Sequence, residues 1–199
     1  ESIAAINKYL ADESGRQPGS GALELWYGHA EMNSGRRSTT TYGALDAFFP
    51  AVLALSGDLG RARRLQQSSF SMWMLHGTEP EEINYKTMAV TYPGYPLRPE
   101  LVESTYYLFH YTRDHEYQRM GAQLFRDFVR HCRTDAGYAA LSSVVTKEQS
   151  DSMPSFLFAE TFKYFYLLFA PANALRFDQV IFNTEAHPLR RTWRRRSNR

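Results

Sequence analysis

The chain has 199 residues, of which 43% are hydrophobic and 15% aromatic, so it can bury one sizeable core and is too apolar for a disordered chain. No apolar run approaches the roughly 20 residues that cross a bilayer, and we predict no membrane span. The net charge of +2 is misleading, because six arginines crowd the last ten residues and leave the rest of the chain acidic. For the body of the chain we therefore predict no nucleic-acid partner.

The first residues, Ser2–Leu10, already carry a helical pattern, and the sequence starts with neither an initiating methionine nor a signal-peptide pattern. We therefore expect these residues to be part of a longer polypeptide. No low-complexity linker interrupts residues 1–188, which we interpret as one domain portion.

Two helical hairpins of one design are predicted in the middle of the chain. In each, a short break with an aspartate restarts the second helix, where the carboxylate can accept free amide hydrogens. The restarting residues are Asp58 and Asp114. The predicted helices are Ala44–Ser56 with Leu59–His76, and Arg98–Thr112 with Glu116–His131.

The Arg98–Thr112 segment and a further helix, Phe156–Phe169, carry apolar residues on nearly every side. Such helices are buried between layers, which predicts an all-α fold with an inner ring of helices inside an outer ring, an α/α barrel. Three strand-like pieces fall between the helices and fit short β-hairpins at one mouth of the barrel. They are Leu23–Ala30, Gly137–Val145 and Gln179–Phe182.

Charged residues gather where the Arg98–Thr112 helix begins. Arg98, Glu100 and Glu103 follow an apolar, aromatic approach through Tyr95 and Leu97. Glutamates in a first turn also complement the positive end of the helix dipole, so an ordinary structural role stays open. Apolar walls around carboxylates shift their pKa values toward catalytic use, which is the functional alternative.

Glu160 is an acid inside an otherwise aromatic helix, four residues after Phe156, so the two side chains are expected on one face. A ring beside an acid suits a sugar, with the ring against its C–H face and the acid on its hydroxyls. The alternative is a core glutamate paired with a cation such as Lys163, because an unpaired buried acid is costly.

The segment Phe182–Pro188 follows a strand-like run and contains Thr184 and Glu185. Thr184 offers a hydroxyl and a carbonyl oxygen, both suited to a hard cation that takes six to eight oxygens. His187 has no histidine or cysteine partner nearby, which argues against zinc.

In this order, the segments 95–104, 151–160 and 182–188 resemble the class I α-1,2-mannosidases, glycoside hydrolase family 47. Within the family, the run Tyr95–Glu100 looks like the EDEM branch, which serves endoplasmic reticulum glycoprotein quality control. The resemblance implies an (α/α)7 barrel, of which this chain holds about half, with the remainder in a preceding N-terminal part. It also implies a calcium-dependent, inverting exo-α-1,2-mannosidase that trims high-mannose N-glycans in the endoplasmic reticulum lumen. A protein disulfide isomerase is an implied partner, and a mannosidase-like lectin is the alternative function.

Residue by residue, the resemblance assigns Glu100 as the catalytic carboxylate and Thr184 as the direct Ca²⁺ ligand. The implied substrate-site residues are Arg98, Glu103, Phe156, Glu160 and Glu185.

One position departs from the family pattern. Gly43–Pro50 aligns with a segment that usually opens on a catalytic-site aspartate, so Gly43 stands where that acid is expected. Asp46, three residues on, could share the same helical face, about 4.5 Å further along the axis. Either catalysis uses the remaining groups, or activity is reduced.

Two features stay open. Cys132 is the only cysteine and has two interpretations, a buried free thiol or half of a disulfide to a cysteine outside these residues, as in similar proteins. The arginine-rich tail, residues 189–199, could bind nucleic acid or acidic lipid, but its lack of periodic apolar residues favours a disordered, solvated end, and we assign it no function.

Overall fold

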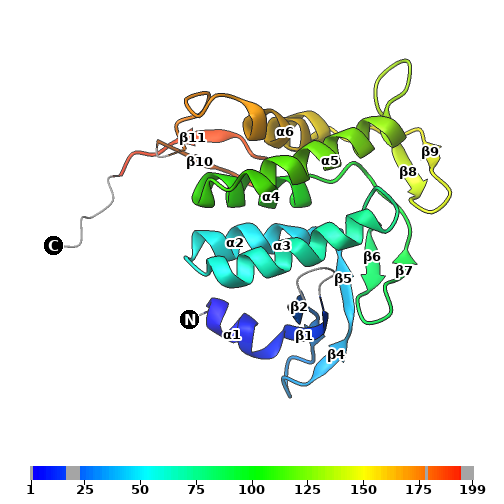
Figure 1. Ribbon diagram of the computed structural model, residues 1–199, viewed down its shortest axis with the longest axis vertical. Helices are drawn as coiled ribbons and strands as arrows, with labels where there is room; N and C mark the ends of the chain where they lie inside the picture. Colours follow the sequence, from blue (N-terminus) through cyan, green and yellow to red (C-terminus); the bar gives the residue numbers. More distant parts are fainter. Residues whose placement is uncertain (1, 17–22, 178, 194–199) are drawn as a thin grey trace.

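The computed structural model describes residues 2–16, 23–177 and 179–193 and places its helices in stacked pairs (Figure 1). The chain enters through α1 (Ser2–Tyr9), and the first hairpin pairs a 3₁₀ turn (Ala44–Phe48) and α2 (Phe49–Leu55) with α3 (Leu59–Met74). The second hairpin pairs α4 (Glu100–Thr112) with α5 (His115–Cys132), and a π turn (Leu157–Thr161) leads into α6 (Phe162–Phe169).

The predicted helices are confirmed, and so are their caps. The Asp58 carboxylate accepts the amide hydrogen of Arg61, and the Asp114 carboxylate accepts that of Glu116. The main deviations are at helix starts, where Ala44–Phe48 is 3₁₀ and Leu157–Thr161 is π-helical instead of α-helical.

The helix α4 lies at the centre of the packing, in contact with α2, α3, α5 and α6. Its residues Leu101, Val102 and Leu108 are all buried, as the all-round apolar pattern predicts. The helices α2, α4 and α6 contact one another in a row, with α3 packed on α2 and α5 on α4, as expected of an α/α barrel portion. No described helix is long and apolar enough to cross a membrane.

Short antiparallel strands fill the connections, more of them than the sequence indicates. The sheets pair β1 (Ala11–Arg16) with β2 (Leu23–Tyr27), and β3 (His29–Ala30) with β4 (Arg37–Thr39). A three-stranded sheet joins β5 (Thr41–Gly43), β6 (Glu82–Asn84) and β7 (Ala89–Tyr92), and β8 (Ala140–Ser143) pairs with β9 (Glu148–Ser150).

The last pair, β10 (Val180–Phe182) and β11 (Pro188–Arg190), packs along the helices, with the Phe182 ring 5.9 Å from that of Tyr164 in α6. This pairing corrects the expected boundary of the tail, because Leu189 and Arg190 lie in β11, paired with β10. Residues 194–199 lie outside the described residues.

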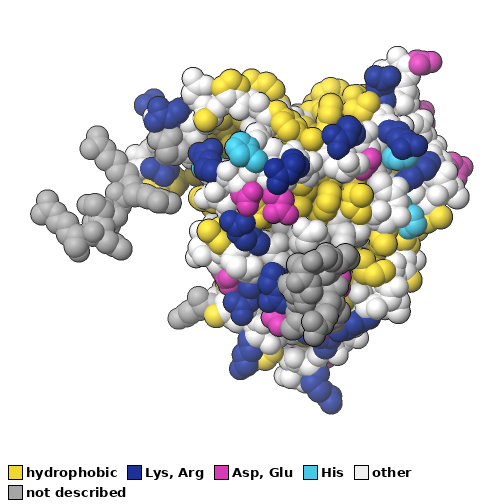
Figure 2. Space-filling model, viewed as in Figure 1, with side chains coloured by type: hydrophobic (Ala, Val, Ile, Leu, Met, Phe, Trp, Pro, Cys, Tyr) yellow, Lys and Arg dark blue, Asp and Glu magenta, His cyan; other side chains and the backbone are white. Residues whose placement is uncertain are grey.

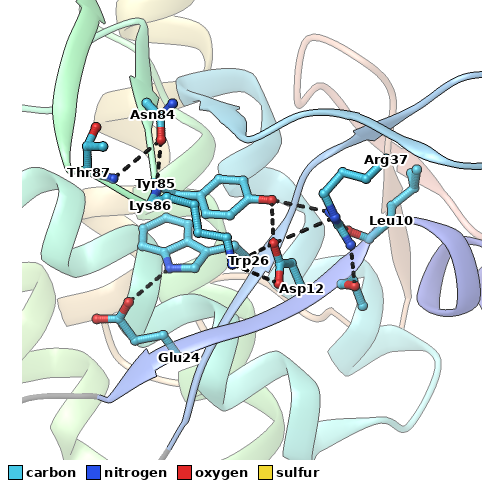
Figure 3. Close-up of polar contacts among 10 residues, drawn as sticks. Leu10, Asp12, Glu24, Trp26, Arg37, Asn84, Tyr85, Lys86 and Thr87 are labelled. Atoms are coloured by element: carbon cyan, nitrogen blue, oxygen red, sulfur yellow. Dashed lines mark hydrogen bonds and ion pairs between the residues drawn. The ribbon is translucent and has the colours of Figure 1, made fainter.

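A polar network ties the N-terminal strands to the central sheet (Figure 3). Asp12 accepts hydrogen bonds from the Tyr85 hydroxyl at 2.9 Å and from Lys86 Nζ at 3.1 Å, while Arg37 Nε lies 3.6 Å from it. The Tyr85 ring stacks on Trp26 at 5.6 Å. Gly28 is needed here, because a Cβ atom would lie 2.6 Å from the Tyr85 hydroxyl. The network therefore fixes the hairpin that precedes Gly43.

The surface carries mixed charge. On the face in Figure 2, Lys and Arg side chains are spread over the molecule with acidic side chains between them. One such pair, Arg63 Nη1 and Asp114 Oδ2 at 3.2 Å, joins α3 to the cap of α5. Exposed pairs of this kind contribute little stability, about 0–1 kcal/mol, so the fold rests on its core.

Candidate active site

The start of α4 is held in an unusual backbone conformation. Leu97 is fully buried and has φ = 66°, a left-handed conformation that a branched side chain rarely adopts. The Thr161 hydroxyl, from the π turn before α6, donates to the Leu97 carbonyl at 2.9 Å and holds this bend. The bend places Arg98 just before α4 and Glu100 at its first residue.

Glu100 and Glu103 lie three residues apart in the first turn of α4, and both are largely buried. Burial raises the pKa of Glu100 to about 7, with Glu103 and Glu160 adding to the effect. Its Oε2 atom is buried and has no hydrogen-bond partner among the described residues. Burial also raises the pKa of Glu103, although that carboxylate accepts a 2.8 Å hydrogen bond from Tyr164.

Arg98 is committed to a neighbour. Its Nε and Nη2 atoms donate to the two carboxylate oxygens of Glu81, each at 2.8 Å, in a bidentate pair whose side chains are only 21% and 18% exposed. Arg98 thereby tethers the segment before β6 to the start of α4.

Glu160 joins this cluster from the π turn. Burial raises its pKa to about 7, and the nearby carboxylates of Glu185 and Glu103 raise it further. The alternative partner, Lys163, acts on Glu160 only weakly: its charge lowers the pKa of Glu160, but no salt bridge joins the two among the described residues. Lys163 Nζ donates instead to the carbonyl of Ala186.

The β10–β11 turn brings Glu185 to Glu160 and leaves Thr184 exposed. The Asn183 side chain shapes the turn by accepting the amide hydrogens of Glu185 and His187, at 3.1 and 2.9 Å. In the described part of the chain, no group of three His, Cys, Asp or Glu residues could hold a metal ion, and His187 belongs to no such group. Phe156 lies partly exposed just before the π turn.

Two acids at this site escape the sequence interpretation, Glu79 and Glu81. Glu79 is 1% exposed, and neither of its oxygens is hydrogen-bonded to a described residue. The sequence feature that could have pointed to them is the acid-rich run around Pro80, but such a run also fits an ordinary solvated turn.

Gly43 ends β5 and has an ordinary extended backbone, with φ = −103°. The Asp46 carboxylate turns back within the 3₁₀ turn and accepts the Gly43 amide hydrogen at 2.8 Å. A Cβ atom at Gly43 would lie 3.2 Å from the Glu81 carbonyl oxygen and 3.5 Å from Asp46 Oδ2. Burial raises the pKa of Asp46. A Cβ atom there is in ordinary contact with Asp46 and fits if the Glu81 backbone shifts by a few tenths of an ångström.

Cys132 lies in the core with none of its surface exposed, and burial raises the pKa of its thiol to about 12. Within this chain it is a buried free thiol, and a bond to a cysteine outside these residues stays a prediction.

Comparisons of the chain with known proteins identify its family. The profile of glycosyl hydrolase family 47 matches residues 1–191. "ER degradation-enhancing alpha-mannosidase-like protein 1" of Schizosaccharomyces pombe is 36% identical over 166 residues, covering 82% of this chain and 21% of that protein. "Alpha-mannosidase I MNS4" of Arabidopsis thaliana is 37% identical over 174 residues, covering 82% and 28%. The chain thus spans well under a third of the length of these two relatives.

A solved α-1,2-mannosidase from Trichoderma reesei superposes with a TM-score of 0.77 at 24% identity, covering 95% of this chain and 45% of that one. The match confirms the fold, an α/α barrel of which this chain forms about half.

Proposed function

Because the chain belongs to glycosyl hydrolase family 47, we propose that it forms part of a calcium-dependent, inverting exo-α-1,2-mannosidase that trims high-mannose N-glycans of misfolded glycoproteins. The names of its relatives, "ER degradation-enhancing" among them, support the endoplasmic reticulum lumen as its location and ER-associated degradation as its pathway. A protein disulfide isomerase partner rests on the family resemblance alone.

One observation carries the proposal: at the start of a central helix, Glu100 has a pKa of about 7 and a buried oxygen to which no described residue donates a hydrogen bond. A general base works best when its pKa lies near the working pH. Glu100 can therefore take a proton from a water molecule as that water attacks the sugar. Glu103, in the same helical turn as Glu100, is oriented by the hydrogen bond from Tyr164.

Inversion needs a second carboxyl group on the other side of the scissile bond, separated from the base by a water-sized gap. This chain covers 45% of the solved mannosidase, and we propose that the proton donor comes from the other part of such a barrel. The chain's own contribution is then the base, the carboxylates that orient hydroxyls and the ring of Phe156 as a sugar platform.

The residues of the β10–β11 turn fit a calcium ion by their chemistry, because Thr184, Glu185 and the adjacent Glu160 offer only oxygen donors. Thr184 would hold the ion directly. When bound, the ion would orient sugar hydroxyls and offset the charge of the neighbouring acids. The nearby Glu185 carboxylate adds to the raised pKa of Glu160, and crowding of negative charge at one site is what a divalent cation relieves.

A lectin that holds high-mannose glycans without hydrolysis is the second candidate. Gly43 favours it, because the family pattern places an acid there and this chain has none. The proximity of Asp46 and Glu81 to Gly43 shows that restoring an aspartate requires a small local adjustment.

Glu100→Gln in the intact protein tests the proposal. The change keeps the volume and removes the proton acceptor, so mannose release from a high-mannose glycan should fall about 10²- to 10⁴-fold. Glycan binding and calcium binding should persist. The control is Glu148→Gln, an exposed glutamate in β9.

Three further outcomes discriminate the candidates. Gly43→Asp should raise the rate of mannose release if the missing acid limits it. Equal release by wild type and Glu100→Gln would exclude Glu100 as the base. Glycan binding without release by either protein would establish the lectin.

A further inference from the structure

Glu79 is a buried carboxyl group that the proposed mechanism does not use. It lies between α3 and β6, is 1% exposed, and has no hydrogen bond to a described residue at either oxygen. An ionised carboxylate in such a place is strongly disfavoured, and native proteins rarely keep one without a role.

The segment that carries Glu79 is fixed on both sides. Lys147 Nζ donates to the Thr78 hydroxyl at 3.0 Å and to the carbonyl of His76. On the other side, Arg98 binds both oxygens of Glu81. The side chain of Glu79 is therefore held in place by its neighbours, and both nearby cations already have partners.

The charged and titratable groups that face Glu79 come from three directions. Glu100 faces it from α4, Glu81 and Arg98 from their ion pair, and Tyr42 and Tyr95 from β5 and the approach to α4. The first acid in this set, Glu100, also has a buried oxygen without a partner among the described residues. Glu79 and Glu100 are thus two buried carboxyl groups whose charges act on each other, and the cation of this set, Arg98, is already paired with Glu81.

Two such carboxyl groups cannot both ionise easily, so the pair retains one proton. Burial raises the pKa of Glu79 well above its usual range, and the charges of Glu100 and Glu81 raise it further. Glu100 ionises first, because it is less buried than Glu79 and the charge of Arg98 lowers its pKa.

We propose that Glu79 is a positioning residue that acts through Glu100. Its neutral carboxyl group keeps a proton near the base. Loss of that proton at alkaline pH adds a second buried negative charge near Glu100 and disables the site. This role rests on the proposed function, since it presumes that Glu100 acts as a base. The existence of the buried proton does not depend on it.

The buried proton is tested by stability. A native carboxyl group with a raised pKa binds a proton that the unfolded chain releases above about 4.5, so stability is lost as pH rises through the native pKa. Glu79→Gln removes this effect. For each pH unit between 5 and 7, the factor by which the unfolding equilibrium constant rises should therefore be about ten times larger for wild type than for Glu79→Gln.

Urea denaturation of the intact protein at several pH values measures this difference. Glu148→Gln, the same chemical change at an exposed site, should follow wild type. If Glu79→Gln does not fold, Glu79→Leu serves instead, because it also removes the proton and suits an apolar site. A variant whose pH dependence matches wild type would overturn the proposal.

The positioning role is tested by the pH profile of mannose release. Glu79→Gln should keep the acid limb near pH 7, which belongs to Glu100, and extend the alkaline limb by about one pH unit or more. A changed stability slope with an unchanged alkaline limb would refute the positioning role. If the intact protein releases no mannose at any pH while the slope changes as expected, the proposed function fails and the buried proton stands.

Discussion

Replacing Arg98 by methionine should leave an excess of buried negative charge at the start of α4. The guanidinium makes two 2.8 Å hydrogen bonds to Glu81, and both side chains are about four-fifths buried. Methionine keeps the length of the side chain and removes the charge. Glu81 then remains beside Glu79 and Glu100 with its partner gone.

The expected loss is about 3 kcal/mol of unfolding free energy. Removing one partner of a buried pair costs about 3–5 kcal/mol, and the lower end applies here because neither side chain is fully enclosed. For a chain of this size, that loss corresponds to roughly 6–12 °C in Tm. Glu81→Gln in the Arg98→Met background should recover most of it, because no unpaired charge is left.

A double-mutant cycle by urea denaturation measures the coupling between Arg98 and Glu81, expected at about 2 kcal/mol. The control cycle uses Arg64 and Glu13, a 2.9 Å pair whose side chains are 30% and 47% exposed, where coupling should stay below about 1 kcal/mol. Equal coupling in the two cycles would refute the argument that burial makes the Arg98 pair special.

Two further predictions concern the core. Gly121→Ala in α5 should destabilise the protein by about 1–3 kcal/mol, because its Cβ would lie 1.9 Å from Leu168 Cδ2. Gly60→Ala in α3, whose Cβ would meet only Asp58 Oδ1 at 3.9 Å, should be neutral or slightly stabilising. Urea denaturation of both variants decides, and equal effects would count against the packing. Cys132 should resist alkylation in the native protein and react after unfolding, because its thiol is buried. A disulfide to another cysteine would instead keep it unreactive until reduction. Mass spectrometry of the alkylated protein distinguishes the two.

Much of the helical framework could be predicted because its signals are local. Asp58 and Asp114 cap the helices they precede, and Gly77 takes a left-handed φ of 69° just beyond α3. Each of these effects depends on a few neighbouring residues, which one sequence displays. The start of α4 was predicted two residues early, since Arg98 and Pro99 look helical but precede the first helical residue, Glu100.

The missed elements depend on partners far away in the chain. The strands β5, β6 and β7 have three or four residues each, too short for an alternating pattern, and β5 finds its partner β6 only across the α2–α3 hairpin. The buried position of Glu79 arises in the same way, because its segment is fixed by Arg98 and by the distant Lys147, both later in the chain. Sequence shows a glutamate beside a proline, and only the fold shows that water does not reach it.

Charge balance connects the separate proposals. Carboxyl groups form a continuous chain of neighbours through the site, in the order Glu81, Glu79, Glu100, Glu103, Glu160 and Glu185. Against them stand Arg98, which pairs with Glu81, and Lys163, which faces Glu160 but donates to a backbone carbonyl. So many neighbouring acids cannot all be ionised in a partly buried space without further positive charge. The proton proposed on Glu79 lowers the charge at one end of this chain, and the calcium ion proposed at Thr184 offsets it at the other. Glu100, between them, is then the group whose ionisation near pH 7 the site can sustain.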